Sequence, residues 1–267
     1  MDDNLPGDHE HASNQSEMSL IKDDQEPFCH FFRNSNPETT ILSMDSSSEI
    51  CIPPMSTYLQ GELESTSHIF TSTAPSFDLI ILDPPWPNRS ARRKKSYSIS
   101  YTTADIAALL SSIPIKNHLT EDSFVGIWIT NKPAFHDLVL SSGGIFDQWD
   151  VELSEEWIWL KVTSSGTPIS SLAGTWRKPY EVFLLGRKKL SSGSRSPSIK
   201  RRVLVAVPDL HSRKPNMKTL FESMLPSKYE ALEIFARNLT AGWWAWGNEV
   251  LKFQHQDQWT ADVSDCQ

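Results

Sequence analysis

The sequence predicts an α/β domain, because short apolar runs typical of buried strands alternate with segments of helical periodicity. With 267 residues, 39% of them hydrophobic, the chain can bury one substantial core. Residues 77–82 form a nearly continuous apolar run that stops at Asp83, as expected for a strand covered on both faces. The same pattern predicts further strands in residues 124–130, 157–160, 182–185 and 203–207.

Helices are predicted between and after these strands. Thr103 is a suitable N-cap for a helix that continues through Leu110 with apolar residues on one face. Pro133 is placed to open a second helix, since proline is favoured at the first helical position. Pro215 opens a third helix, whose apolar positions continue to Leu225.

The composition changes along the chain and predicts its organisation. Residues 1–26 are acidic without apolar periodicity, which predicts a disordered tail. Residues 27–75 are expected to form a small β-rich lead-in, and residues 76–252 a single α/β domain. Within that domain residues 188–201 are expected to be a loop, and residues 253–267 form a loose polar tail.

The net charge of −8 is distributed unevenly. Residues 1–26 hold eight acidic residues against one lysine, which leaves residues 27–267 with a net charge of about −1. Basic residues cluster in 89–95 and again in 187–202. Because phosphate binding depends on local cationic density, the acidic total does not exclude a nucleic-acid partner.

Several classes of protein are disfavoured. The three cysteines are widely spaced without a CxxC pair, so neither a disulfide framework nor a metal site is expected. No apolar run is long enough for a membrane span, and the acidic first residues do not resemble a secretion signal. We therefore expect an intracellular protein of the nucleus or cytoplasm. A G-x-G-x-x-G loop and a P-loop are both absent.

The strongest local signal is Asp83-Pro84-Pro85-Trp86 at the end of an apolar strand. Ligands of open α/β sheets bind beyond the carboxyl ends of strands. The Asp83 carboxylate and the Pro84 carbonyl can accept both hydrogens of a flat amino group, while Trp86 can stack on the attached ring. A stiff structural turn would explain an isolated Asp-Pro-Pro. After this strand, and with Trp86 added, the motif favours a catalytic site that methylates an aromatic amine.

Further blocks accompany this motif in a fixed order. They are residues 128–131, 156–161, 178–186, 211–215, 232–238 and 242–254. Together with the DPPW motif they resemble the adenine-N6 methyltransferases, the family of the eukaryotic messenger-RNA adenosine methyltransferase. Within that family, residues 50–254 look most like the methyltransferase-like protein four branch.

The resemblance implies a Rossmann-like fold that binds S-adenosylmethionine (SAM), with the acceptor motif placed before the main cofactor segment. It also implies a strand in residues 232–236, where the sequence alone permits a helix. The residues that match the family's cofactor contacts are Asp83, Lys214, Arg237, Asn238, Asn248 and Glu249. Glu62 is the nearest candidate for a further acidic contact upstream of the motif.

Candidate substrate contacts come from two sources. The basic run after the motif is expected to contact phosphates, with a neighbouring tyrosine that either stacks on a base or anchors the next helix. These residues are Arg89, Arg92, Arg93, Lys94 and Tyr97. The resemblance adds Asn131, Glu156 and Lys178, and also Arg213, where the family usually has histidine.

The function that follows is SAM-dependent N6-methylation of adenine in nucleic acid. RNA is preferred, because a base in duplex DNA must first be flipped out of the stack. The resembling branch is associated with 2′-O-methyladenosine in small nuclear RNA and with adenine in DNA. DNA methylation, another amine acceptor, and a catalytically silent nucleic-acid-binding subunit stay open as alternatives. The sequence is compatible with activity as a monomer and does not specify a protein partner.

Overall fold

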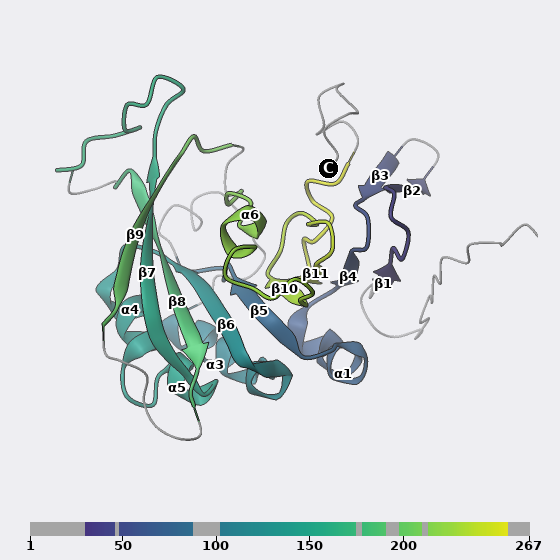
Figure 1. Cartoon of the computed structure of the whole chain (residues 1–267), viewed down its shortest axis with the longest axis horizontal. Helices are drawn as coiled ribbons and strands as arrows, with labels where there is room; N and C mark the ends of the chain where they lie inside the picture. Colours follow the sequence, from purple (N-terminus) through teal and green to yellow (C-terminus); the bar gives the residue numbers. More distant parts are fainter. Residues whose placement is uncertain are drawn as a thin grey trace, which may run out of the picture.

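The computed structural model describes residues 30–45, 48–87, 102–174, 178–190, 198–209 and 213–255. They form a nine-stranded sheet and a separate two-stranded hairpin (Figure 1). In spatial order the large sheet contains β1 (His30–Arg33), β4 (Thr57–Gln60), β11 (Trp244–Gly247), β10 (Ala231–Ile234), β5 (Phe77–Leu82), β6 (Leu119–Ile129), β8 (Tyr180–Lys188), β7 (Val151–Lys161) and β9 (Lys200–Ala206). The hairpin consists of β2 (Thr40–Asp45) and β3 (Ser48–Ile52).

The middle of the sheet is parallel. β4, β11, β10, β5 and β6 all run in the same direction, while β8 is antiparallel to both β6 and β7. β10 and β11, which come from the end of the chain, lie between β4 and β5. This order confirms the predicted Rossmann-like α/β fold with a permuted arrangement. It also gathers the carboxyl ends of five strands at one edge of the sheet, where such folds bind ligands.

Helices cover mainly one face of this sheet. The helical segments are α1 (Leu63–Thr73), α3 (Thr103–Ser112), η1 (Ile115–His118), α4 (Pro133–Leu140), α5 (Ile145–Gln148) and α6 (Lys218–Phe221). α1, α3, α4 and α5 pack on one face, and α6 packs on the other (Figure 1). Each face has its own apolar cluster, so β5 and β6 are buried on both sides, as the continuous apolar runs predict.

Five tryptophans in or near the apolar runs are buried. Trp157, Trp159, Trp243, Trp244 and Trp246 are at most 5% exposed. A buried indole N–H needs a hydrogen-bond acceptor. Trp246 donates to the Thr66 hydroxyl at 2.8 Å, and Trp157 donates to a carboxylate on its own strand. These rings therefore stabilise the core, and of the five only Trp243 also borders the cavity described below.

Two of the predicted helices differ in detail. The first is capped by Thr102 and not by Thr103, because Thr102 forms a reciprocal capping box with Asp105. The helix that opens at Pro133 is confirmed. The third is shorter than its apolar spacing suggests, since α6 ends at Phe221 and turns continue to residue 225. Those turns keep the apolar side chains on the core side, which reproduces helical spacing without a helix.

The segment 27–75 is not separate from the main domain among its described residues. β1 and β4 belong to the large sheet, and residues 63–73 form a helix where a β-rich lead-in is predicted. This helix is rich in serine and threonine, so its apolar face is weak in sequence. It is fixed by burial of Ile69 and Phe70 and by the Thr66 hydroxyl, which donates to the Glu62 carbonyl at 2.8 Å.

Two predicted loops are also shorter than expected. β8 continues to Lys188 and β9 begins at Lys200, so the ends of the predicted 188–201 loop are strand. At the carboxyl end, Gln254 is fully buried and donates to the Cys51 carbonyl at 2.6 Å, which shows that residues 253–255 belong to the fold. The predicted tail 1–26 and residues 256–267 lie outside the described residues.

Candidate active site

The DPPW loop begins directly beyond β5. The Asp83 N–H donates to the carbonyl of Ile234 on the adjacent strand β10, at 3.3 Å. The Trp86 N–H donates to the Pro84 carbonyl at 2.8 Å, which closes a tight turn. Two prolines limit the backbone freedom of this turn further. The Asp83 carboxylate is therefore held in a defined position at the ligand-binding edge of the sheet.

The Trp86 side chain fixes the other end of the loop. Its indole N–H donates to the Trp128 carbonyl on β6 at 2.7 Å, and its ring lies 4.6 Å from the ring of Phe135 on α4. Only 9% of Trp86 is exposed. Lys132, a residue outside the predicted site, donates to the Pro87 carbonyl at 2.7 Å. These contacts anchor the loop, while stacking of Trp86 on a substrate base stays a prediction.

Charged side chains from several strands meet behind this loop. Lys214 Nζ lies 2.8 Å from one oxygen of Asp83 and 3.1 Å from Glu181 on β8. Glu181 in turn forms an ion pair with Lys161 at the end of β7. The side chains of Asp83 and Lys214 are only 15% and 16% exposed. Acidic and basic groups thus alternate through a partly buried network. Each charged group has a partner of opposite charge, which offsets the hydration that the group loses on burial.

The network determines the charge state of its central members. Burial alone would lower the pKa of Lys214, but the carboxylates of Asp83 and Glu181 outweigh it and raise that pKa. Burial alone would raise the pKa of Glu181, yet the ammonium groups of Lys214 and Lys161 hold it below its ordinary value. Lys214 is therefore positively charged and Glu181 negatively charged at neutral pH, as a stable pair requires.

A third carboxyl group behaves differently. Glu233 on β10 lies near Asp83, and burial together with the charge of Asp83 raises the pKa of Glu233 to about 7. Among the described residues no hydrogen bond or ion pair reaches its carboxyl group. Neither Glu181 nor Glu233 was identified from the sequence. The available signal was an acidic residue within a short, otherwise apolar strand.

A cavity of about 370 Å³ adjoins this network. Trp128 and Trp243 form part of its wall, and the polar side chains that line it include Asp209, Arg213, Lys214, Glu233, Asn238 and Gln254. This volume and this mixture of aromatic and polar groups are typical of small-molecule sites. Two predicted cofactor residues, Lys214 and Asn238, therefore line one cavity together with Glu233.

The remaining cofactor candidates form a second group along the same edge. Arg237, just after β10, pairs with Glu249 at 3.0 Å, and Asn248, just after β11, donates to Glu62 beyond β4 at 2.9 Å. The structure thus brings Glu62 and Asn248 together, while their contact with a shared ligand stays a prediction. Gly247, directly before Asn248, has φ +149°, and a Cβ at this position would lie 3.2 Å from the Phe235 Cα. The close approach of the two backbones requires glycine.

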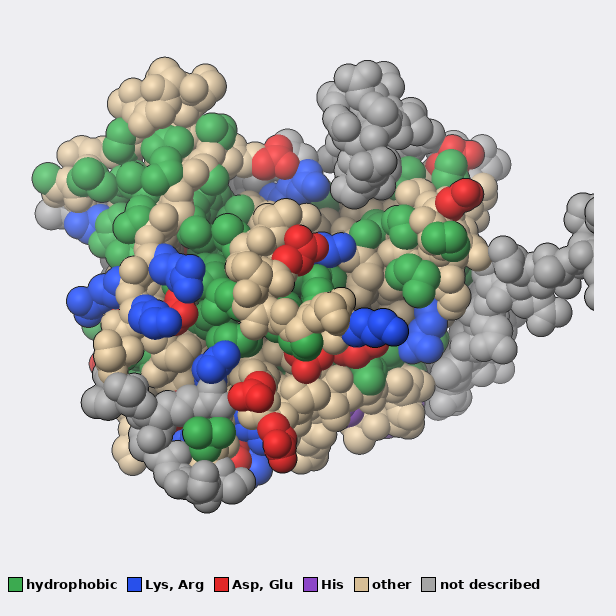
Figure 2. Space-filling view, viewed as in Figure 1, with side chains coloured by type: hydrophobic (Ala, Val, Ile, Leu, Met, Phe, Trp, Pro, Cys, Tyr) green, Lys and Arg blue, Asp and Glu red, His purple; other side chains and the backbone are tan. Residues whose placement is uncertain are grey.

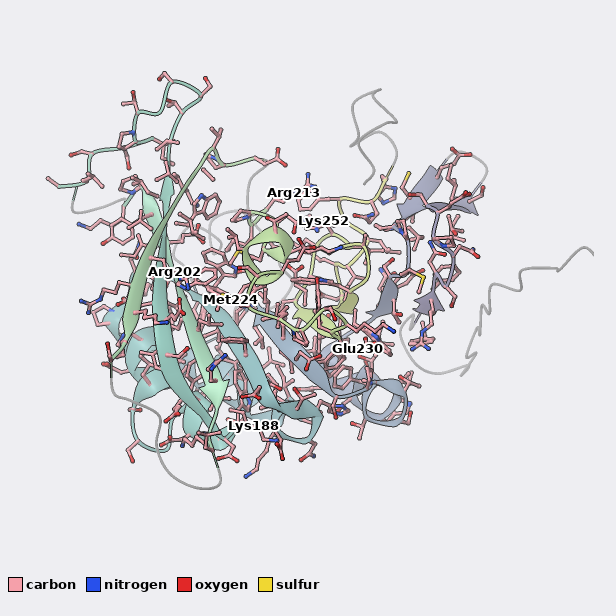
Figure 3. All side chains as sticks on the ribbon, in the orientation of Figure 1. Lys188, Arg202, Arg213, Met224, Glu230 and Lys252 are labelled. Carbon is pink, nitrogen blue, oxygen red and sulfur yellow. The ribbon has the colours of Figure 1, made fainter. Side chains whose placement is uncertain are left out.

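The predicted substrate contacts are dispersed. Asn131 follows β6 and donates to the Tyr180 carbonyl at 2.8 Å, while Lys178 is half-buried just before β8. Arg213 lies at the cavity and donates to Asp209 at 2.8 Å. Figure 3 shows Arg213 near the loops above β10, far from Lys188 and Arg202 on the strands of the opposite side. Lys188 and Arg202, two members of the basic cluster 187–202, therefore lie apart from the cavity.

Glu156 lies on the face of β7 opposite to the charged network. Side chains alternate along β7, and Trp157, Trp159 and Lys161 lie on the face that carries the charged network. Glu156 faces the other way and accepts a hydrogen bond from Arg201 at 3.1 Å. Its role beside the acceptor pocket stays a prediction, and Glu181 is the acid that reaches Lys214.

Some predictions concern residues beyond the described part of the chain. Arg89, Arg92, Arg93, Lys94 and Tyr97 lie between residues 88 and 101, which the structure does not describe. Their expected contacts with phosphates and bases stay predictions. Within the described ranges no cluster of His, Cys, Asp and Glu could hold a metal ion. None of the helices there is long and apolar enough to cross a membrane.

The permuted sheet and the DPPW loop at its ligand-binding edge define the class of Rossmann-like methyltransferase folds. The chain belongs to the MT-A70 family, a family of SAM-dependent methyltransferases, which matches residues 77–249. This membership confirms the resemblance based on the ordered sequence blocks.

Relatives extend the comparison. The chain is 52% identical over 209 residues to the N6-methyladenosine RNA methyltransferase MTA1 of Cryphonectria parasitica, a match that covers 78% of this chain and 62% of the relative. It is 34% identical over 224 residues to the N(6)-adenine-specific methyltransferase METTL4 of Mus musculus, covering 80% and 46%. It is 29% identical over 237 residues to a DNA N6-methyl methyltransferase of Caenorhabditis elegans, covering 88% and 62%. The chain thus spans about half to three fifths of the length of these relatives.

Proposed function

We propose that this protein transfers a methyl group from SAM to the N6 nitrogen of adenine in nucleic acid, with RNA as the preferred polymer. The observation that carries the proposal is the intact DPPW loop, whose Asp83 carboxylate is held by Lys214 at the ligand-binding edge of the sheet. The family and the names of the relatives support the same chemistry.

The residues at this edge fit SAM by the chemistry of their side chains. SAM carries an amino acid portion, a ribose and an adenine, and it would supply the electrophilic methyl group. Lys214, Glu233 and Asn238 offer the cavity an ammonium, a carboxyl and an amide group. Arg237, Asn248, Glu249 and Glu62 provide donors and acceptors suited to hydroxyl groups and to a base edge. We propose that the first group binds the amino acid portion and the second the nucleoside.

The DPPW loop would bind the acceptor amine. The Asp83 carboxylate accepts one amino hydrogen and the Pro84 carbonyl accepts the other, because a carbonyl already bonded to the Trp86 N–H keeps a second lone pair. Two acceptors draw the nitrogen out of conjugation with the ring and aim its lone pair. Lys214 fixes the orientation of the Asp83 carboxylate. The rate enhancement then comes from positioning and electrostatics, without a strong base.

The choice of polymer depends on access to the adenine. A duplex base must be flipped at a cost of a few kcal/mol, whereas a single-stranded RNA base is already accessible. We propose Arg89, Arg92, Arg93 and Lys94 as phosphate contacts beside the acceptor loop. A 2′-O-methyladenosine acceptor and an intracellular site of action, nuclear or cytoplasmic, are further parts of this proposal.

The test is a methyl-transfer assay with SAM and matched single-stranded substrates. The substrates are RNA, the same RNA with 2′-O-methyladenosine at the target position, and DNA of the same sequence, and the product nucleosides are identified by mass spectrometry. Asp83→Asn should lower turnover by about 10²-fold or more, the usual loss when one electrostatic contact to the reacting group is removed. Asp147→Asn is the matched control, since Asp147 pairs with Lys189 on the far side of the sheet.

Two results would overturn the proposal. The first is the absence of N6-methyladenine from all three polymers with a folded protein that binds SAM. The second is an Asp83→Asn variant as active as the wild type. Calorimetry with SAM separates these results from the alternative of a silent subunit, because a silent subunit would bind RNA but not SAM.

A further inference from the structure

Lys161 is the outermost member of the charged network, at the end of β7. Its backbone is fixed on two sides, because its N–H donates to the Pro179 carbonyl at 2.7 Å and its carbonyl accepts from the Ile169 N–H at 3.1 Å. Its ammonium group forms an ion pair with Glu181 and lies 4.5 Å from the centre of the Trp159 ring. Lys161 does not line the cavity of about 370 Å³. It is therefore held beside Glu181 without bordering the space for a ligand.

This lysine differs from the basic side chains on the nearby surface. Figure 2 shows lysine and arginine side chains at several places on the surface over β7 and β9. The side chain of Lys161, by contrast, is only 20% exposed, and that of Glu181 is 28% exposed. Water and salt screen exposed ion pairs strongly and partly buried pairs much less. The charge of Lys161 therefore acts strongly on Glu181.

Three contacts in sequence connect Lys161 with the acceptor loop. The first is its ion pair with Glu181. The second and third belong to Lys214 Nζ, which lies 3.1 Å from Glu181 and 2.8 Å from Asp83. Lys214 is thus shared between two carboxylates at similar distances, and each attracts it away from the other. The hold of Lys214 on Asp83 therefore depends on how well Glu181 is neutralised from its other side.

No other group takes over this neutralisation in the described parts of the chain. Burial opposes ionisation of Glu181, yet the ammonium groups of Lys214 and Lys161 hold its pKa below the ordinary value. These two lysines are the only donors that reach its carboxylate there. Thr130 directly follows β6, the strand between β5 and β8, but its buried hydroxyl has no hydrogen-bond partner within the same ranges. Without Lys161, Glu181 would be left with Lys214 alone.

We propose that Lys161 is a positioning residue, which neutralises Glu181 and so leaves Lys214 to hold the Asp83 carboxylate toward the acceptor amine. The inference rests on the proposed methyl transfer at Asp83. Lys161 acts through two intervening side chains and not by contact with the substrate. It accounts for a mostly buried lysine that pairs with an acid of the site and stays outside the cavity.

The first test measures methyl transfer from SAM to a single-stranded RNA. Lys161→Met keeps a long apolar side chain on Trp159 but removes the charge. We expect kcat to fall about tenfold and KM for SAM to change less than about twofold, because Lys161 does not line the cavity. Lys161→Arg restores a cation and should keep most of the activity. Lys189→Met is the matched control, since Lys189 follows the end of β8 opposite to Glu181 and pairs there with Asp147.

Two results of this test would overturn the proposal. One is a wild-type kcat in the Lys161→Met protein. The other is a raised KM for SAM at an unchanged kcat, which would indicate a direct contribution to cofactor binding.

The second test asks whether Lys161 acts through Glu181. In a Glu181→Gln protein no charge remains for Lys161 to neutralise. There, the further change Lys161→Met should lower kcat by less than about twofold, whatever Glu181→Gln itself costs. A tenfold loss in both backgrounds would show that Lys161 has an independent structural role and would refute the proposal.

Thermal unfolding separates failure of this inference from failure of the proposed function. A wild type that transfers no methyl group would contradict the function, but the coupling within the network could still be measured. Within the described ranges no hydrogen bond or ion pair joins Lys161 directly to Asp83. The decreases in melting temperature caused by Lys161→Met and Asp83→Asn should nevertheless be coupled through Lys214, so that the double variant loses less than their sum. Additive decreases would overturn the inference whether or not the protein is active.

Discussion

Replacing Glu233 with glutamine tests whether this carboxyl group carries a proton in the folded protein near neutral pH. The side chain lies in a mostly apolar strand beside Asp83, and burial is the main reason that its pKa rises to about 7 from an ordinary value of 4.5. Glutamine has nearly the same shape as protonated glutamate but cannot ionise. The variant therefore removes the titration and leaves the packing almost unchanged.

The sign and size of the effect follow from proton linkage. Between these two pKa values the unfolded chain has released the proton while the folded chain still holds it, so rising pH lowers the stability of the wild type. The pKa difference of about 2.5 corresponds to about 3 kcal/mol at 1.36 kcal/mol for each unit. This value is an upper limit, because the side chain borders the cavity and is only partly buried. The stability that protonated Glu233 contributes to the folded state is fully present below about pH 4.5 and is lost as the pH rises through about 7.

The assay is urea unfolding of the wild type and of Glu233→Gln at about pH 5 and about pH 8. All other titrating groups are common to both proteins, so their effects cancel in the difference between the two free energies of unfolding. Between about pH 5 and about pH 8, we expect the free energy of unfolding of the variant to rise by between about 1 and 3 kcal/mol relative to that of the wild type. If the free energies of unfolding of the two proteins changed equally over this pH range, Glu233 would not hold a proton that the unfolded chain releases.

Three substitutions test the local geometry by thermal unfolding. Gly247→Ala should cost about 1–3 kcal/mol, because φ is +149° and the new Cβ would press on Phe235; an unchanged melting temperature would contradict this. Thr102→Ala removes the capping box and should lower the free energy of unfolding by about 1 kcal/mol, or the melting temperature by roughly 2–4 °C. Thr102→Ser keeps a hydroxyl at the cap and should retain most of this stability. Trp86→Phe leaves a buried β6 carbonyl without its donor, at about 1–3 kcal/mol, and should reduce methyl transfer as well. Wild-type stability and turnover in this variant would show that the indole N–H does not anchor the loop.

The fold could be predicted where burial leaves a pattern in the sequence. β5 and the middle of β6 are apolar on both faces and were recognised directly. The first residues of β6 were missed because Glu121 and Asp122 are exposed there, and an apolar run reveals only the buried part of a strand. The assignment of residues 232–236 to a strand depends on the family resemblance, because periodicity cannot distinguish a four-residue apolar strand from a helix.

The site could be predicted only in part, because its members meet through long-range packing. Asp83 and Lys214 were both identified, yet they are separated by 131 positions and nothing in the sequence shows that they touch. Glu181 could not be recognised as a partner of Lys214 because the strand register was unknown, and a change of one residue moves a side chain to the other face. Sequence patterns define the faces of each strand, whereas the pairing of strands decides which faces meet.

The same pairing explains why one of the three acids at the site holds its proton to a higher pH than an ordinary carboxyl group does. Asp83 and Glu181 each face an ammonium group, supplied by Lys214 and Lys161, so two negative and two positive charges are matched. Glu233 adds a third carboxyl group without a cation of its own among the described residues. If it ionised, its repulsion of Asp83 would compete with Lys214 for the orientation of the carboxylate that defines the acceptor site. An uncompensated buried charge is costly, so retaining the proton on Glu233 keeps both the stability of the strand and the alignment of Asp83.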